Sequence, residues 1–125
     1  ELQGVELIDV NSIENRAMLK VTFLVANPGD VTVTVPVISY RLFADGSEIG
    51  NGAYSTEDVA MPGRAAFYPD AEIPLKNKMT IVMSEMSETV YNKIVSGQIV
   101  QYSATGQMTV ESAWSIVELD FDTSS

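Results

Sequence analysis

Two alternating runs between Arg16 and Ala44, joined by the stretch Asn27-Pro28-Gly29-Asp30, constrain the fold of this chain more than any other feature. In the first run every second residue is apolar: Ala17, Leu19, Val21, Phe23 and Val25. This period of two is typical of a β-strand with one buried face. In the joining stretch, the asparagine side chain can hydrogen-bond to backbone groups of its own turn, proline fixes φ, and glycine tolerates a left-handed conformation. The sequence therefore predicts two strands joined by a turn.

The second of these runs changes parity at Pro36. Its apolar residues are Val31, Val33 and Val35 before the proline and Ile38, Tyr40, Leu42 and Ala44 after it. Because side chains alternate strictly along a strand, this change requires a kink or a bulge, and proline also removes one ladder donor. We predict that the strand bends at Pro36 and passes there from one sheet to another.

Further extended segments flank this pair of strands. Asp45-Gly46 is a strong hairpin signal, since both central residues of the favoured turn need positive φ. Pro69 and Pro74 place one irregular segment either at a sheet edge or bent across a corner, and a parity shift in the first segment indicates a bulge. The expected strands are Val5–Val10, Ser47–Tyr54, Arg64–Leu75, Gln98–Glu111 and Trp114–Asp122, with a loop at Thr56–Asp58 and a turn at Met61–Gly63.

One helix is expected between Met79 and Ser96. Apolar residues recur there at spacings of three and four: Met79, Met83, Met86, Val90 and Ile94. Gly97 fits a glycine C-cap, while Asn77 and Ser84 are alternative N-caps. The fold class is therefore all-β with one helix, a single domain of residues 1–125 built as a β-sandwich with a helical insertion near residues 79–96.

Charge and composition exclude several functions. Seventeen acidic and seven basic residues give a net charge of -10, which repels nucleic acid and anionic lipid surfaces. Without Cys or His, the chain cannot form disulfides, Ser-His-Asp triads, Cys nucleophiles or the usual zinc sites. Charge-free runs such as Val31–Tyr40 are far shorter than the ~20 residues of a membrane helix. The chain starts at Glu1, so we leave the compartment open between a cytoplasmic protein and one anchored by an upstream segment.

Acidic residues are the remaining candidates for metal binding or catalysis. None of their close pairs has the regular oxygen-ligand spacing of a calcium loop, and the terminal pair fits the exposed face of a last strand. These pairs are Asp120 with Asp122, Glu57 with Asp58, and Asp45 with Glu48. Gly50-Asn51-Gly52 opens a dinucleotide-like motif, but no helix follows it. We therefore expect no metal, no cofactor and no enzymatic activity.

An ordered set of turn and strand residues resembles a known family. The set is Asn27-Pro28, Val35-Pro36, Tyr40, Gly46, Gly52, Met61-Pro62, Gly97, Tyr102 and Gly106. It is similar to the water-stress-and-hypersensitive-response (WHy) domain of the folded, atypical late embryogenesis abundant proteins, over roughly Val5 to Val110. Gly29 stands where that pattern often has a second Asn, and Gln101 where it often has Pro. The resemblance implies an immunoglobulin-like or fibronectin-type-III-like sandwich, an association with dehydration stress, and no catalytic residues.

Three functional hypotheses follow. The first is a non-catalytic stress-protection domain that makes weak contacts with other proteins or membrane surfaces. The second is a carrier of a small apolar ligand or lipid in a pocket beneath the helix, lined by the helix-spaced residues Met79, Met83, Met86, Val90 and Ile94. The third is an adhesion or assembly module that uses an edge strand, with an apolar stretch near Val31–Val37. In all three, the signature turn Asn27-Pro28-Gly29-Asp30 is expected to serve the fold rather than bind a ligand.

Overall fold

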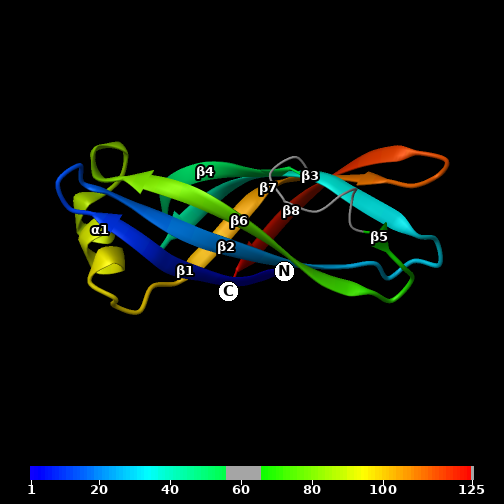
Figure 1. The fold of residues 1–125 in the computed structure, drawn as a ribbon, viewed down its shortest axis with the longest axis horizontal. Helices are drawn as coiled ribbons and strands as arrows, with labels where there is room; N and C mark the ends of the chain where they lie inside the picture. Colours follow the sequence, from blue (N-terminus) through cyan, green and yellow to red (C-terminus); the bar gives the residue numbers. More distant parts are fainter. Residues whose placement is uncertain (56–65, 125) are drawn as a thin grey trace.

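The chain forms two antiparallel sheets packed face to face, with one helix at an end of the sandwich (Figure 1). The computed structural model describes residues 1–55 and 66–124. The three-stranded sheet has the order β1-β2-β6, with bounds Leu2–Asn11, Arg16–Ala26 and Glu72–Val82. The second sheet has the order β4-β3-β7-β8, with bounds Ser47–Ser55, Val33–Ala44, Tyr102–Glu111 and Ile116–Ser124, and β5 (Ala66–Phe67) pairs with β3. The predicted all-β sandwich with one helix is confirmed.

Strand β2 is the centre of the three-stranded sheet, and its predicted face is buried. Each of its residues pairs with β6, from Arg16 opposite Val82 to Ala26 opposite Glu72. The inward-facing residues Ala17, Leu19, Val21 and Phe23 are all buried in the core. On its other side β1 pairs with two register shifts, one of them between Leu7 and Asp9, which confirms the predicted bulge.

Strand β3 bends near Pro36 but stays in one sheet, so the predicted passage between sheets is wrong. Its register against β7 shifts between Thr34 and Val37, and Val35 and Ile38 are both buried despite their opposite parity. β5 pairs with β3 before the proline, and β4 pairs with it after the proline. Pro36 thus lies in the gap between two pairing partners, where its missing N–H breaks no ladder bond. The bulge therefore changes which residues face the core, while the strand remains in the same sheet.

The helix is shorter than predicted and begins nine residues later. Met79 belongs to β6, and α1 spans Glu88–Val95, after a single 3-10 turn at Met83–Glu85. Three β-branched residues, Thr80 to Val82, favour the strand, which is paired with β2 along its whole length. Tertiary pairing therefore outweighs the helical spacing of the methionines.

The ends of α1 follow local capping chemistry. Ser87 is the N-cap, and its Oγ accepts from the Val90 N–H (3.5 Å), so neither Asn77 nor Ser84 caps the helix. Gly97, with φ of +80°, ends it as predicted. The hairpin at Asp45-Gly46 is also confirmed, since both residues have positive φ.

Three further predictions concern the segment between β4 and β6. The loop at Thr56–Asp58 and the turn at Met61–Gly63 lie outside the described residues. The single extended segment predicted for Arg64–Leu75 is two strands in different sheets: β5 pairs with β3, and β6, which starts at Glu72, is the outer strand of the three-stranded sheet. The segment therefore crosses from one sheet to the other, the second of the two predicted placements, and its last part lies at an edge.

Candidate functional site

The signature turn is held by a buried asparagine. The Asn27 side chain is 7% exposed, and its Nδ2 donates to the carbonyls of Val31 (2.8 Å) and Phe67 (2.9 Å). Its Oδ1 accepts from the Gly29 N–H (3.1 Å). The amide therefore uses both of its donors and its acceptor inside the protein. Pro28, Gly29 and Asp30 are exposed. Through its bond to the Phe67 carbonyl, Asn27 links the end of β2 to β5.

A second group of signature residues surrounds Tyr40, whose hydroxyl connects the two sheets. Tyr40 on β3 pairs with Gly52 on one side and Gly106 on the other. A Cβ on Gly52 would lie 2.5 Å from the Tyr40 hydroxyl, and a Cβ on Gly106 would lie 1.9 Å from the Ser39 carbonyl oxygen. The hydroxyl donates to Asn77 Oδ1 on β6 (2.5 Å), and burial raises the pKa of Tyr40 well above its usual range. Gly52 therefore makes room for the tyrosine that joins the sheets, whereas Gly106 makes room for the β3 backbone within one sheet.

The five residues predicted to line a pocket beneath the helix do not share a helical face. Met79 is buried on β6, Met83 lies in the 3-10 turn, and Met86 precedes α1. Only Val90 and Ile94 belong to α1, where Ile94 is buried. All five pack against the same hydrophobic core. The ligand pocket at this end stays a prediction.

Two of the acidic residues weighed as metal candidates, Asp45 and Glu48, are engaged in other contacts. Asp45 accepts from Lys93 Nζ (2.6 Å) and from the Gln101 N–H (2.9 Å), which ties the hairpin to α1. The bond from Lys93 and then the bond from Gln101 lower the pKa of Asp45. Glu48 pairs with Arg41. No group of three or more metal-ligating side chains occurs within residues 1–55 and 66–124, and Glu57 and Asp58 lie outside them.

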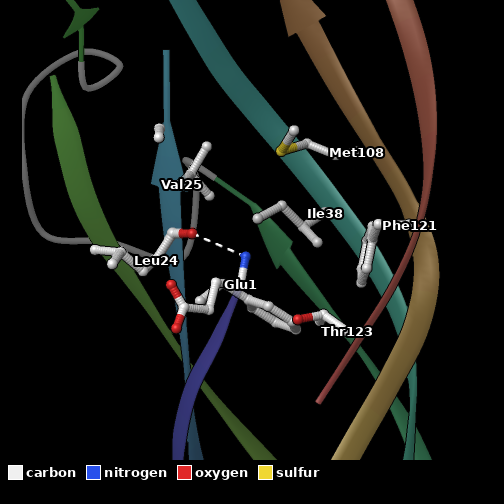
Figure 2. Close-up of a pocket in the computed structure, with 9 residues that line it drawn as sticks. Glu1, Leu24, Val25, Ile38, Met108, Phe121 and Thr123 are labelled. Atoms are coloured by element: carbon white, nitrogen blue, oxygen red, sulfur yellow. Dashed lines mark hydrogen bonds between the residues drawn. The ribbon is translucent and has the colours of Figure 1, made fainter. Parts of the chain in front are cut away.

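A cavity of about 200 Å³ opens between the sheets at the seam where β2 faces β8; we call it the seam cavity (Figure 2). Figure 2 shows Ile38, Met108 and Phe121 on one side of it and Val25 on the other. Its lining residues are mostly apolar and come from both sheets: Glu1, Phe23, Leu24, Val25, Ala26, Ile38, Met108, Phe121 and Thr123. Sequence reasoning missed this cavity because its residues are spread over four strands and share no motif. The available signal was the inward parity of Phe23.

The first half of β8 and the turn before it expose large apolar side chains, which we call the β8 strip: Trp114, Ile116, Val117 and Leu119, exposed by 81%, 68%, 45% and 46%. β8 is the outer strand of its sheet. Val31 and Val37, in the apolar stretch expected from the sequence, are each exposed by only 37%. Acidic residues alternate with the strip, and Asp120 accepts from Gln107 Nε2 (3.0 Å). The β8 strip therefore exposes apolar side chains on both faces of an acidic edge strand, with Ile116 on one face and Val117 and Leu119 on the other.

Comparisons with known proteins establish the fold and nothing finer. No family model and no curated protein sequence matches the chain. A crystal structure of a protein from Archaeoglobus fulgidus matches with 16% identity and a TM-score of 0.55, over 100% of this chain and 94% of that one. A solution structure of a protein from Arabidopsis thaliana matches with 16% identity and a TM-score of 0.63, over 99% and 78%. An X-ray structure of a structural genomics target matches with 10% identity and a TM-score of 0.61, over 99% and 81%.

The described part of the chain contains no helix that is long and apolar enough to cross a membrane.

Proposed function

We propose that this chain is a non-catalytic protection domain that acts under desiccation and related stress. It keeps other proteins apart and makes weak contacts with apolar segments that they expose as they unfold. Two observations from the sequence support this proposal: the ordered signature residues resemble the WHy domain, and the net charge is -10. Like charge on every copy keeps the folded chains hydrated and separate as water is withdrawn.

The observation that carries the proposal is the β8 strip. Soluble proteins bury most large apolar side chains that lie next to one another, and a contiguous exposed group marks an interaction surface. Here Ile116, on the outer strand of a sheet, and Trp114, in the turn before it, are more than two thirds exposed. An edge strand can pair with another extended segment through its backbone, while its side chains add apolar contact.

Charge argues for a foreign partner at this edge rather than a second copy. Glu118, Asp120 and Asp122 alternate along β8, and no ion pair joins any of them to a described residue. Two copies paired edge to edge would bring these carboxylates together, and like charges across strands destabilise pairing. A less acidic extended segment meets no such repulsion. The β8 strip therefore fits an unfolding neighbour.

The test is to dry or heat a labile enzyme with this protein and then measure the activity that remains. The reference is an equal mass of an inert protein of similar size and charge. We expect more activity to be retained with this protein. Equal retention in both samples would remove stress protection as an intrinsic property of the chain.

A pair of matched variants separates the β8 strip from general charge shielding. V117T/L119T removes apolar contact but keeps strand propensity, whereas I13T/I99T removes two apolar side chains that are 93% and 90% exposed elsewhere. We expect the first variant to lose protection and the second to keep it. Protection through the strip should also survive high salt, while shielding weakens over a Debye length of ~10 Å at 0.1 M. Full protection by V117T/L119T would refute the role of these two side chains, and full protection by Ile116→Thr as well would refute the role of β8 in the strip.

A further inference from the structure

We propose that the seam cavity binds one small, neutral, apolar molecule. This inference is independent of the protection function, because it rests on a different surface and a different kind of ligand. The cavity has a volume of about 200 Å³ and lies between two sheets that are otherwise packed against each other. The position of the cavity, its lining residues, its volume and its charge each restrict the class of ligand that it can bind.

The cavity exists because the two long seams of the sandwich are closed differently. On one side β6 and β4 are bridged where Asn77 Nδ2 donates to the Ala53 carbonyl (2.9 Å). On the other side, β1 starts at Leu2 opposite Phe23, and Glu1 exchanges two backbone bonds with Leu24 (2.7 and 3.0 Å). Beyond that pair, the last residues of β2 have no β1 partner among the described residues and face the open seam.

The floor of the cavity is rigid and aromatic. Phe23 is 3% exposed and contacts Tyr40 edge to face, with ring centroids 5.0 Å apart. It makes a second edge contact with Phe121 across the sandwich, at 5.7 Å and 72°. Ile38, 1% exposed, completes the floor. Such aromatic contacts fix ring positions, so the space beside them is preformed rather than collapsed.

The rim of the cavity can adapt. Met108 and Phe121 face inward from β7 and β8 but remain only partly buried (Figure 2). Methionine has three rotatable bonds and a polarizable sulfur, so it adjusts to irregular ligands. A bound apolar molecule would cover the half-exposed sides of both residues. The hydrophobic effect would then favour the bound state.

Size and charge define the ligand class. A dry apolar cavity of ~150 Å³ holds a single benzene ring, so about 200 Å³ accommodates one or two rings or a short chain. The volume falls below the roughly 300 Å³ at which sites for larger ligands begin, which excludes a two-chain lipid. Eight of the nine described lining residues are uncharged, and a carboxylate that enters such an apolar site loses its hydration. The cavity should therefore prefer neutral molecules to carboxylates of the same length.

The test uses the whole chain and toluene as the probe, read out by NMR with methyl-labelled methionine. Met108 is the one methionine among the described residues that line the cavity, whereas Met79 and Met86 lie near the helical end. We expect toluene to shift the Met108 methyl signal in a saturable way and to leave those of Met79 and Met86 unchanged. Equal movement of all three signals, or no saturable shift of Met108, would overturn the proposal.

Two controls sharpen the result. Met108→Trp fills the cavity and should abolish the toluene-induced change in the Phe121 ring signals, while Met86→Trp should leave it intact. Circular dichroism verifies that both variants are folded, and the wild-type Met108 signal decides the question if Met108→Trp is not. In parallel, 1-octanol should shift the Met108 methyl signal at lower concentration than octanoate does. Equal potency of alcohol and carboxylate would refute the preference for neutral ligands.

Discussion

Replacing Asn27 by alanine tests whether the signature turn serves the fold. The change removes both donors to the carbonyls of Val31 and Phe67 and the acceptor for the Gly29 N–H. The bond to Phe67 is buried, so its loss carries the full penalty of an unsatisfied carbonyl, about 1–3 kcal/mol. The other two bonds are partly buried and contribute about 0.5–1 kcal/mol each. We therefore expect Asn27→Ala to lower the free energy of unfolding by about 2–5 kcal/mol.

The assay for this prediction is urea denaturation followed by far-UV circular dichroism. Fluorescence is the poorer probe, because Trp114 is 81% exposed in the native state. A domain of this size typically unfolds with about 5–15 kcal/mol, so the loss is measurable and leaves a folded population. The urea midpoint should fall while the slope stays constant, as expected when the native state alone is weakened.

Two companion variants decide what the asparagine contributes. Asn27→Asp keeps the shape and the acceptor but presents a carboxylate to two carbonyls, so at pH 7 it should destabilise at least as much as alanine does. Asn51→Ala, at an exposed position of β4, should change stability by no more than about 0.5 kcal/mol. Wild-type stability of Asn27→Asp would show that the two donors do not hold the turn. A near-neutral Asn27→Ala would refute the structural role altogether.

Two further predictions address other parts of the fold. Gly106→Ala should lower the urea midpoint strongly, since its Cβ would lie 1.9 Å from the Ser39 carbonyl oxygen. Gly4→Ala should leave the midpoint unchanged, because no atom lies within 4 Å of the added Cβ. Equal midpoints of the two variants would contradict the close approach of Gly106 to Ser39. The pKa of Asp45 is lowered in the folded state, so its contribution to stability is present above the unfolded pKa of ~3.9 and is lost as pH falls through the folded value. The melting-temperature gap between wild type and Asp45→Asn should thus shrink from pH 7 to pH 2.5, and a constant gap would argue against the contact with Lys93 and Gln101.

Local sequence patterns correctly predicted those features of the fold that depend on neighbouring residues in the chain. The alternation around Val21 predicted a buried strand face, and Asp45-Gly46 predicted a hairpin, because both depend on neighbouring residues alone. The start of the helix was wrong because spacings of three and four among methionines also fit a strand that ends in a helical turn. What settled Met79 as part of a strand was pairing with Leu19, sixty residues earlier in the chain.

The seam cavity could not be predicted for a related reason. Phe23 and Phe121 approach each other only because β2 and β8 lie on facing sheets at the same seam. Neither residue belongs to a motif, and their separation in sequence hides the pairing. The β8 strip was partly predictable, since the alternation after Trp114 indicated a strand. Its exposure follows from the position of β8 at the sheet edge, which is a property of the topology.

The seam cavity and the β8 strip lie on one strand, yet experiments can separate them. Val117, Leu119 and Phe121 are spaced by two and so face the same side of β8, with Phe121 lining the cavity and the other two exposed. Leu119 is also the cross-strand partner of Met108, whereas Ile116 has the opposite parity and faces the other side of β8. Ile116→Thr should therefore reduce protection without changing the toluene-induced shift of Met108. Met108→Trp should abolish toluene binding without reducing protection, because Met108 lies on β7 and lines the cavity. Loss of both properties in either variant would mean that β8 acts as one unit, and that a molecule in the cavity controls what the edge can bind.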